Sequence, residues 1–188
     1  MKDSDQKLIR DYSNGNDLAF ATLLKRYINL VYNFVYRTCR NNEDAEEIVQ
    51  DTFFKAWKSL KKYREKESFK TWLFTIAKNT MIDLLRKKRS FVFSDFSDKN
   101  DDNKLENILA DEAPLPEEIL IKIEEKRSLE KILEKLPIIY RQLLLLRYQN
   151  DFSFQEISKI LDKPIDTIRS QHRRALAILR EILLDAPN

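Results

Sequence analysis

Apolar residues recur at three- and four-residue intervals along most of the chain, which is the period of an amphipathic α-helix. In the first 90 residues this pattern predicts four helices with turns near Asn14-Gly15, Asn41-Asn42 and Lys61–Glu67, the last helix beginning after Ser68. Four helices with such apolar stripes are enough to close one hydrophobic core.

The period is lost after about residue 90 and returns at about Glu117. Polar and acidic residues fill most of the interval, followed by Pro114 and Pro116, so we predict a flexible linker there. Further helices are expected beyond it, the last two being Phe154–Leu161 and Ile165–Leu184. The expected organisation is all-α, with two small helical domains over residues 1–90 and 117–188 and a linker over residues 91–116.

Composition supports a helical protein and excludes several classes. One glycine and five prolines among 188 residues are too few for a turn-rich β fold. Cys39 and His172 are single residues of their kinds, so neither a disulfide within the chain nor a Cys/His metal cluster is expected, and no cofactor is predicted. No signal core and no membrane-length apolar run are present, which indicates a cytoplasmic protein without membrane insertion.

The net charge of +3 is unevenly distributed along the chain. Residues 61–90 carry ten basic and three acidic side chains, whereas residues 91–125 carry three basic and eleven acidic ones. Residues 126–188 are again basic, with twelve cations against eight acids. Two basic zones separated by an acidic one suggest two modules that bind a polyanion, although solvated helix faces would explain the same runs.

The clearest local motif lies near the C-terminus, where two short helices are separated by Asp162-Lys163-Pro164. This is the arrangement of a helix-turn-helix, whose second helix enters the major groove of DNA. A helical hairpin with a solvated basic face is the alternative. The second helix favours DNA binding because its outward residues are suited to bases and phosphates: Thr167, Arg169, Ser170, Arg173 and Arg174. Ile165, Ile168, Leu176 and Leu179 are expected to face inward.

His172 lies beside this inward stripe. A half-buried structural histidine is therefore favoured over a DNA contact or a pH switch.

Four segments in this order and spacing resemble the extracytoplasmic-function (ECF) subfamily of bacterial RNA polymerase sigma factors. They are DAEEIVQDTFFKAW at residues 44–57, Tyr63-Arg64 with SFKTWLFTIAKN ending at Asn79, DLLRK at 83–87, and SFQEIS at 153–158 continuing to TIRS at 167–170. The helix-turn-helix alone would be a weak match, because many regulators share it. The four segments together are specific.

The resemblance implies a non-enzymatic initiation factor that binds core RNA polymerase, directs it to promoter DNA and is controlled by an anti-sigma factor. It implies that the third helix docks on the clamp helices of the largest catalytic polymerase subunit. An acidic helix face can complement a basic coiled coil, and Phe53 or Trp57 could add an apolar anchor, with core packing an equal alternative. The matching positions are Glu46, Glu47, Gln50, Asp51 and Phe53.

The resemblance also assigns two DNA-binding surfaces. The loop at 61–67 and the fourth helix correspond to the element that binds the minus-ten region, where cations, aromatic rings and amides hold exposed bases. Phe69 and Trp72 are favoured as core residues. The minus-ten set is Lys61, Lys62, Tyr63, Arg64, Phe69, Lys70 and Asn79, with Arg86, Lys87 and Arg89 on duplex phosphates. The minus-thirty-five set is Arg147, Thr167, Arg169, Ser170, Gln171, Arg173 and Arg174.

Three positions depart from the family pattern. Asp162 stands where glycine is usual, Gln171 where arginine is frequent, and His172 where an aliphatic residue is usual. Aspartate tolerates left-handed backbone, so the turn is expected to form, whereas the promoter preference stays open.

A self-sufficient DNA-binding regulator is the alternative function. The acidic third helix followed by a basic, aromatic loop argues against it. An enzyme is the weakest option, because no glycine-rich phosphate loop and no nucleophile–base arrangement is present.

Overall fold

The computed structural model describes residues 4–63, 67–88 and 126–184, and all the regular structure in these ranges is helical, without a strand. The all-α prediction is therefore confirmed. Compact packing divides the described residues into two units, one holding those of residues 4–88 and Gln155–Asp162, the other holding residues 126–154 and 163–184. The predicted linker lies outside the described residues.

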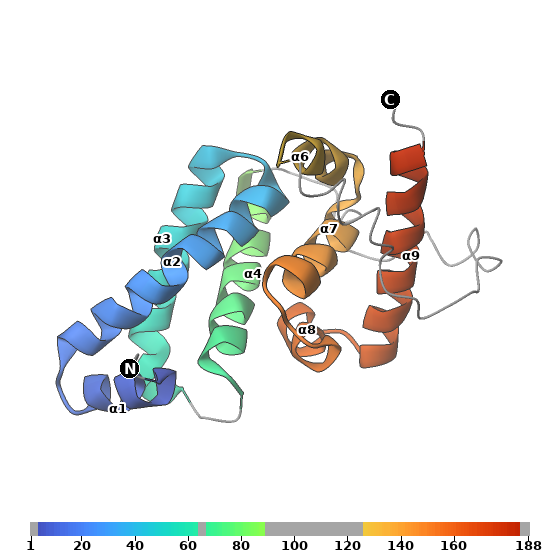
Figure 1. The fold of residues 1–188 in the computed structure, drawn as a ribbon. Helices are drawn as coiled ribbons and strands as arrows, with labels where there is room; N and C mark the ends of the chain where they lie inside the picture. The colour runs from blue at the N-terminus through green and yellow to red at the C-terminus, as the bar shows by residue number, and fades with distance from the viewer. Residues whose placement is uncertain (1–3, 64–66, 89–125, 185–188) are drawn as a thin grey trace. The chain divides into compact units, whose positions relative to one another are not determined.

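The first four helices each begin at a polar residue whose side chain caps them. Ser4, Asn16, Asn41 and Ser68 each accept a hydrogen bond from a backbone N–H in the first turn that follows. The elements are α1 (Asp5–Ser13), α2 (Asp17–Cys39), α3 (Asn42–Ser59), a 3₁₀ turn (Leu60–Lys62) and α4 (Phe69–Lys88) (Figure 1).

Helices α2, α3 and α4 pack against one another, and α1 packs on α2 (Figure 1). The centre of this core includes Phe34 of α2 and Phe74 of α4, whose ring centroids are 5.3 Å apart. Asp5 fixes α1 by accepting hydrogen bonds from Arg26 and Tyr27 of α2. Burial and the Asp5 carboxylate raise the pKa of Tyr27, so this phenol keeps the proton that it donates.

The C-terminal part of the chain contains α6 (Lys126–Lys135), α7 (Ile138–Leu144), a π-helical turn (Leu145–Gln149), α8 (Phe154–Leu161) and α9 (Ile165–Leu184). Helices α6 and α7 both pack on α9. Arg141 of α7 is buried, and its guanidinium donates to the carbonyls of Glu134 and Leu136 at the end of α6. These bonds satisfy carbonyls that the last turn of a helix leaves without intrahelical partners.

The turn between α8 and α9 forms as predicted. Asp162 takes a left-handed backbone conformation with φ of 55°, the geometry for which glycine is usual. In the described part of the chain, no helix has the length and apolar character needed to cross a bilayer.

Candidate docking groove and nucleic-acid interfaces

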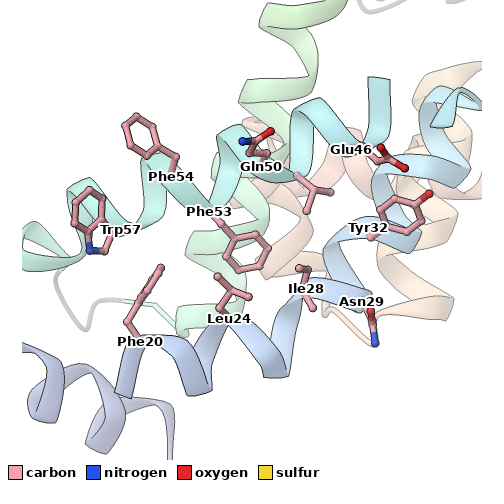
Figure 2. A pocket seen from close by; sticks show the side chains of 11 residues that line it. Phe20, Leu24, Ile28, Asn29, Tyr32, Glu46, Gln50, Phe53, Phe54 and Trp57 are labelled. Carbon is pink, nitrogen blue, oxygen red and sulfur yellow. The ribbon is translucent and has the colours of Figure 1, made fainter. Parts of the chain in front are cut away.

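An apolar groove of about 690 Å³ lies between α2 and α3. Aromatic and aliphatic side chains from both helices face it (Figure 2). Its lining comprises Phe20, Leu24, Ile28, Asn29 and Tyr32 of α2 with Glu46, Val49, Gln50, Phe53, Phe54 and Trp57 of α3.

The two adjacent phenylalanines of α3 differ in exposure. Phe53 points towards Leu24 and Ile28 of α2 and is 7% exposed (Figure 2). Phe54 is 50% exposed and Trp57 is 47% exposed, with ring centroids 6.1 Å apart. Phe53 is thus largely enclosed while it also lines the groove, and its polymerase contact stays a prediction; Phe54 and Trp57 form the exposed aromatic pair. Large exposed apolar groups beside a groove are typical of an interaction surface.

The predicted polar docking residues, three acids and one amide, lie on the solvent side of α3. Glu46, Glu47, Gln50 and Asp51 are all exposed, and two of them, Glu46 and Gln50, also line the groove. Their proximity to the aromatic pair places polar and apolar contacts on one helix face.

One acid of this face is already engaged within the unit. The Lys88 ammonium at the end of α4 lies 3.0 Å from a carboxylate oxygen of Glu47 and 2.8 Å from one of Asp44. Hydrogen bonds to both carboxylates raise the pKa of Lys88, so the lysine remains cationic. The basic end of α4 and the acidic face of α3 are therefore electrostatically joined.

The minus-ten residues divide into exposed and buried groups. Lys61, Asn79, Arg86 and Lys87 are exposed, whereas Lys70 and Tyr63 are half-buried. The Tyr63 hydroxyl donates to the Glu67 carbonyl, which ties the loop to itself. The side chain of Lys62 and all of Arg64 and Arg89 lie outside the described residues.

Phe69 is a core residue. It is buried, and its ring contacts those of Tyr27, Tyr63 and Trp72 at centroid distances of 5.4, 6.0 and 5.5 Å. A ring enclosed in this way is not available for stacking on a DNA base. The burial of Phe69 therefore favours the core alternative, and its direct DNA contact stays a prediction that this burial argues against.

The outward face of α9 retains most of its predicted residues. Arg169 and Arg173 are exposed, and Thr167, Ser170 and Arg174 are half-buried. The Arg169 guanidinium is 3.5 Å from an Asp166 carboxylate oxygen, a surface ion pair that DNA phosphates could replace.

Gln171 does not belong to that face. It is 2% exposed, and the buried positions of α9 are Ile168, Gln171, Ala175 and Leu179. The predicted inward stripe included Ile165 and Leu176, which are half-buried. Ile168 and Leu179 are buried as predicted, but the prediction rested on large apolar side chains and did not include the buried Gln171 and Ala175. This burial argues against a direct DNA contact by Gln171, which stays a prediction.

Arg147 and His172 meet in a small aromatic cluster. The Arg147 guanidinium donates to the Phe152 carbonyl at 3.0 Å and lies 4.9 Å from the centre of the Phe154 ring. His172 is half-buried, as predicted, and its Nε2 is 2.9 Å from the Tyr148 hydroxyl. Burial and the nearby Arg147 charge lower the pKa of His172 to about 4, so its imidazole is neutral at pH 7.

Sequence reasoning missed the α2 side of the groove, Phe54 and Tyr148. A signal for the groove was present in the adjacent apolar pairs Leu23-Leu24, Tyr27-Ile28 and Phe53-Phe54. In each of these three pairs the structure buries the first member and leaves the second partly or largely exposed beside the groove, since successive residues are about 100° apart around the axis.

Family comparisons agree with this architecture. Residues 23–91 match the model of Sigma-70 region 2, and residues 126–179 match the model of Sigma-70, region 4. The chain is 31% identical over 182 residues to the ECF RNA polymerase sigma factor SigW of Bacillus subtilis, covering 96% of this chain and 97% of the relative. It is also 31% identical over 173 residues to the ECF RNA polymerase sigma-E factor of Escherichia coli K12, covering 92% and 90%.

Solved structures show the same fold. Sigma factor RpoE of Bartonella quintana, in complex with the anti-sigma factor NepR, has a TM-score of 0.65 at 25% identity, covering 89% of this chain and 98% of that one. CnrH in complex with the cytosolic domain of CnrY has a TM-score of 0.69 at 24% identity, covering 98% and 100%.

A region 2 followed by a helix-turn-helix region 4 defines a transcription initiation factor of the sigma-70 class. Within that class, the chain belongs to the ECF RNA polymerase sigma factors. It is thus a protein that binds core RNA polymerase and directs promoter-specific initiation.

Proposed function

We propose that this sigma factor docks on core RNA polymerase through the groove between α2 and α3 and the exposed face of α3. The observation that supports it most is the exposed pair Phe54 and Trp57 beside an apolar groove. Glu46, Gln50 and Asp51 on the same face supply charge and hydrogen bonds. The partner is the clamp-helix coiled coil of the largest catalytic subunit. Apolar anchors provide most of the affinity in such interfaces, and charges provide orientation.

The exposed cations and amide of region 2 are proposed to hold the minus-ten element. Asn79 and Arg86 are both exposed on α4, seven residues apart and so on one side of the helix, and Lys61 precedes the loop. Asn79 is suited to a base edge, and the cations are suited to phosphates. Phe69 lies in the core, and its DNA contact is not part of this proposal.

Region 4 is proposed to bind the minus-thirty-five element through the outward residues of α9. Arg169 and Arg173 are exposed cations of this helix, and the half-buried Thr167, Ser170, Arg174 and Arg147 complete the set. Domain boundaries near residues 90 and 117 would separate this module from region 2.

Control by an anti-sigma factor is part of the proposal. A similar sigma factor, RpoE of Bartonella quintana, was solved in complex with the anti-sigma factor NepR. An anti-sigma factor that covers the groove between α2 and α3 would block polymerase docking directly. The sigma factor would act in the cytoplasm, together with RNA polymerase.

The docking proposal is tested by Phe54→Ala combined with Trp57→Ala. Leu18→Ala is the matched control, because Leu18 is a strongly exposed apolar residue outside the groove. The double variant is expected to bind core polymerase at least tenfold more weakly, since each lost anchor costs about 1–2 kcal/mol. Helical circular dichroism should be unchanged in all three proteins. Wild-type affinity in the double variant would overturn the docking site.

A further inference from the structure

The π-helical turn Leu145–Gln149 ends at a buried, hydrogen-bonded asparagine. Asn150 is 1% exposed, and its side-chain Nδ2 donates to the Leu145 carbonyl at 3.0 Å. The next residue, Asp151, has φ of 55°. Isolated π turns are rare, and they frequently occur where a side chain must be redirected for function. The side chains at issue are those within the turn, Arg147 and Tyr148.

Tyr148 is directed to His172 of α9. The hydroxyl and the imidazole Nε2 are 2.9 Å apart, and the two ring centroids are 5.7 Å apart. His172 also contacts the Phe154 ring, at a centroid distance of 5.1 Å and an interplanar angle of 70°. The imidazole orientation is thus restrained by two rings and one hydrogen bond.

The position of His172 places this pair beside the arginines of α9. His172 follows Arg169 by three residues and directly precedes Arg173, so both arginines lie on its exposed side. Tyr148 remains 45% exposed, although its hydroxyl is held by the imidazole. A half-exposed tyrosine, whose hydroxyl is oriented by His172, therefore lies next to a residue that neighbours these arginines on α9.

We propose that Tyr148 is a DNA contact that donates its hydroxyl hydrogen to a backbone phosphate, and that His172 is the positioning residue that holds this hydroxyl. This inference rests on the proposed function of α9 in promoter binding. The imidazole donates Nε2–H to the phenol oxygen, and the phenol O–H is then directed to the phosphate. Hydroxyl donors of this kind fix the register of a protein on duplex DNA.

The protonation states suit this chain of hydrogen bonds. Burial raises the pKa of Tyr148, so the phenol keeps its proton. His172 is neutral at pH 7, so it places no second cation beside Arg147. A permanently cationic side chain at position 172 would repel Arg147 and could not offer a neutral donor.

The test uses the full-length protein with core polymerase and a promoter fragment that the wild-type holoenzyme selects from a random-sequence library. Tyr148→Phe retains the ring and removes the hydroxyl. It is expected to weaken binding about five- to tenfold, the value of one hydrogen bond to a phosphate. The slope of log affinity against log salt should not change, because no charge is removed. Arg173→Ala, the comparison variant, should lower that slope by about one.

His172 is tested through its dependence on Tyr148. His172→Leu should weaken binding to a similar extent, and His172→Gln, which keeps an N–H donor at comparable reach, should restore most of it. In a Tyr148→Phe background, His172→Leu should cause no further loss of affinity. The inference would be overturned if the affinity losses of the two single variants added up in the double variant and each loss were matched by a lower melting temperature. The pair would then have a purely structural role.

The outcomes separate the two proposals. Wild-type binding by Tyr148→Phe together with weak binding by Arg173→Ala would overturn the Tyr148 contact and leave the role of α9 intact. Wild-type binding by Arg169→Ala, Arg173→Ala and Tyr148→Phe alike would overturn the role of α9, and the Tyr148 contact with it.

Discussion

Phe53 and Phe54 are adjacent in sequence but differ in their surroundings, because an α-helix turns by about 100° per residue. Phe53 is enclosed between α2 and α3, whereas Phe54 is half exposed next to Trp57. The same residue type therefore serves the core at one position and the proposed docking surface at the next.

Phe53→Ala should lower the free energy of unfolding by about 3 kcal/mol, at the lower end for buried phenylalanine because its site adjoins a groove. Phe54→Ala should change it by less than about 0.5 kcal/mol. Urea denaturation followed by circular dichroism measures both. Equal destabilisation by the two substitutions would contradict the assigned orientations.

His172 should make stability depend on pH. Its pKa is lowered to about 4 in the folded protein, from an ordinary value of 6.5, so the unfolded chain binds a proton first as the pH falls. Its contribution is fully present above pH 6.5 and is lost between pH 6.5 and 4. Allowing for its partial exposure, the loss from pH 7 to 5 is on the order of 1 kcal/mol.

The measurement compares urea unfolding of the wild type and His172→Leu at pH 7 and pH 5. Carboxylates titrate in both proteins, so the difference between the two pH dependences isolates the histidine. A difference of zero would mean that the imidazole is as well solvated in the folded state as in the unfolded chain.

At the scale of elements, α3 depends on its first turn for correct placement. The Asn41 side-chain oxygen accepts from the Asp44 N–H at 2.9 Å and caps the helix that carries both the acidic face and the aromatic pair. Asn41→Ala should cost about 1 kcal/mol. Asn33→Ala, an exposed position inside α2, is the control and should be neutral or slightly stabilising. Thermal unfolding of both variants tests the cap, and a melting temperature of Asn41→Ala equal to that of the wild type would disprove it.

Helices were well predicted because a three- and four-residue period is a local property of the sequence. The π-helical turn was not predicted. The run Leu143–Leu146 is apolar at every position, so it does not show which side of the helix is buried or where the helical period changes. The buried face of α9 was only partly predicted: Ile168 and Leu179 are buried as expected, whereas Gln171 is polar by type but buried by position. Adjacent apolar pairs hint at a groove, but its two walls could not be assigned, because they come from helices that meet only in the folded protein.

At the scale of the whole molecule, the proposed surfaces act in sequence, because promoter recognition takes place within the holoenzyme. Glu47→Lys with Asp51→Lys should abolish polymerase binding and initiation while leaving the helical signal intact. Arg173→Ala should reduce initiation and leave polymerase binding unchanged.

Combining all three substitutions should give the phenotype of the charge reversal alone. Core-polymerase pull-down and in vitro transcription on the selected promoter measure the two steps separately. Retained polymerase binding by the charge-reversal variant would argue against the acidic face as a docking element.

The left-handed backbone positions have a consequence for protein engineering. Apart from Gly15, the positive φ angles in the described ranges belong to Arg40, Asp151 and Asp162. A residue other than glycine is destabilised by about 1–2 kcal/mol in this conformation, and aspartate by less. Replacing it with glycine removes this strain, but it also raises the conformational entropy of the unfolded chain, which offsets part of the gain in stability. Asp162→Gly should therefore raise the melting temperature slightly while leaving the groove and the arginines of α9 untouched. Relieving backbone strain in this turn should therefore give a more heat-tolerant sigma factor whose proposed contact surfaces are unchanged.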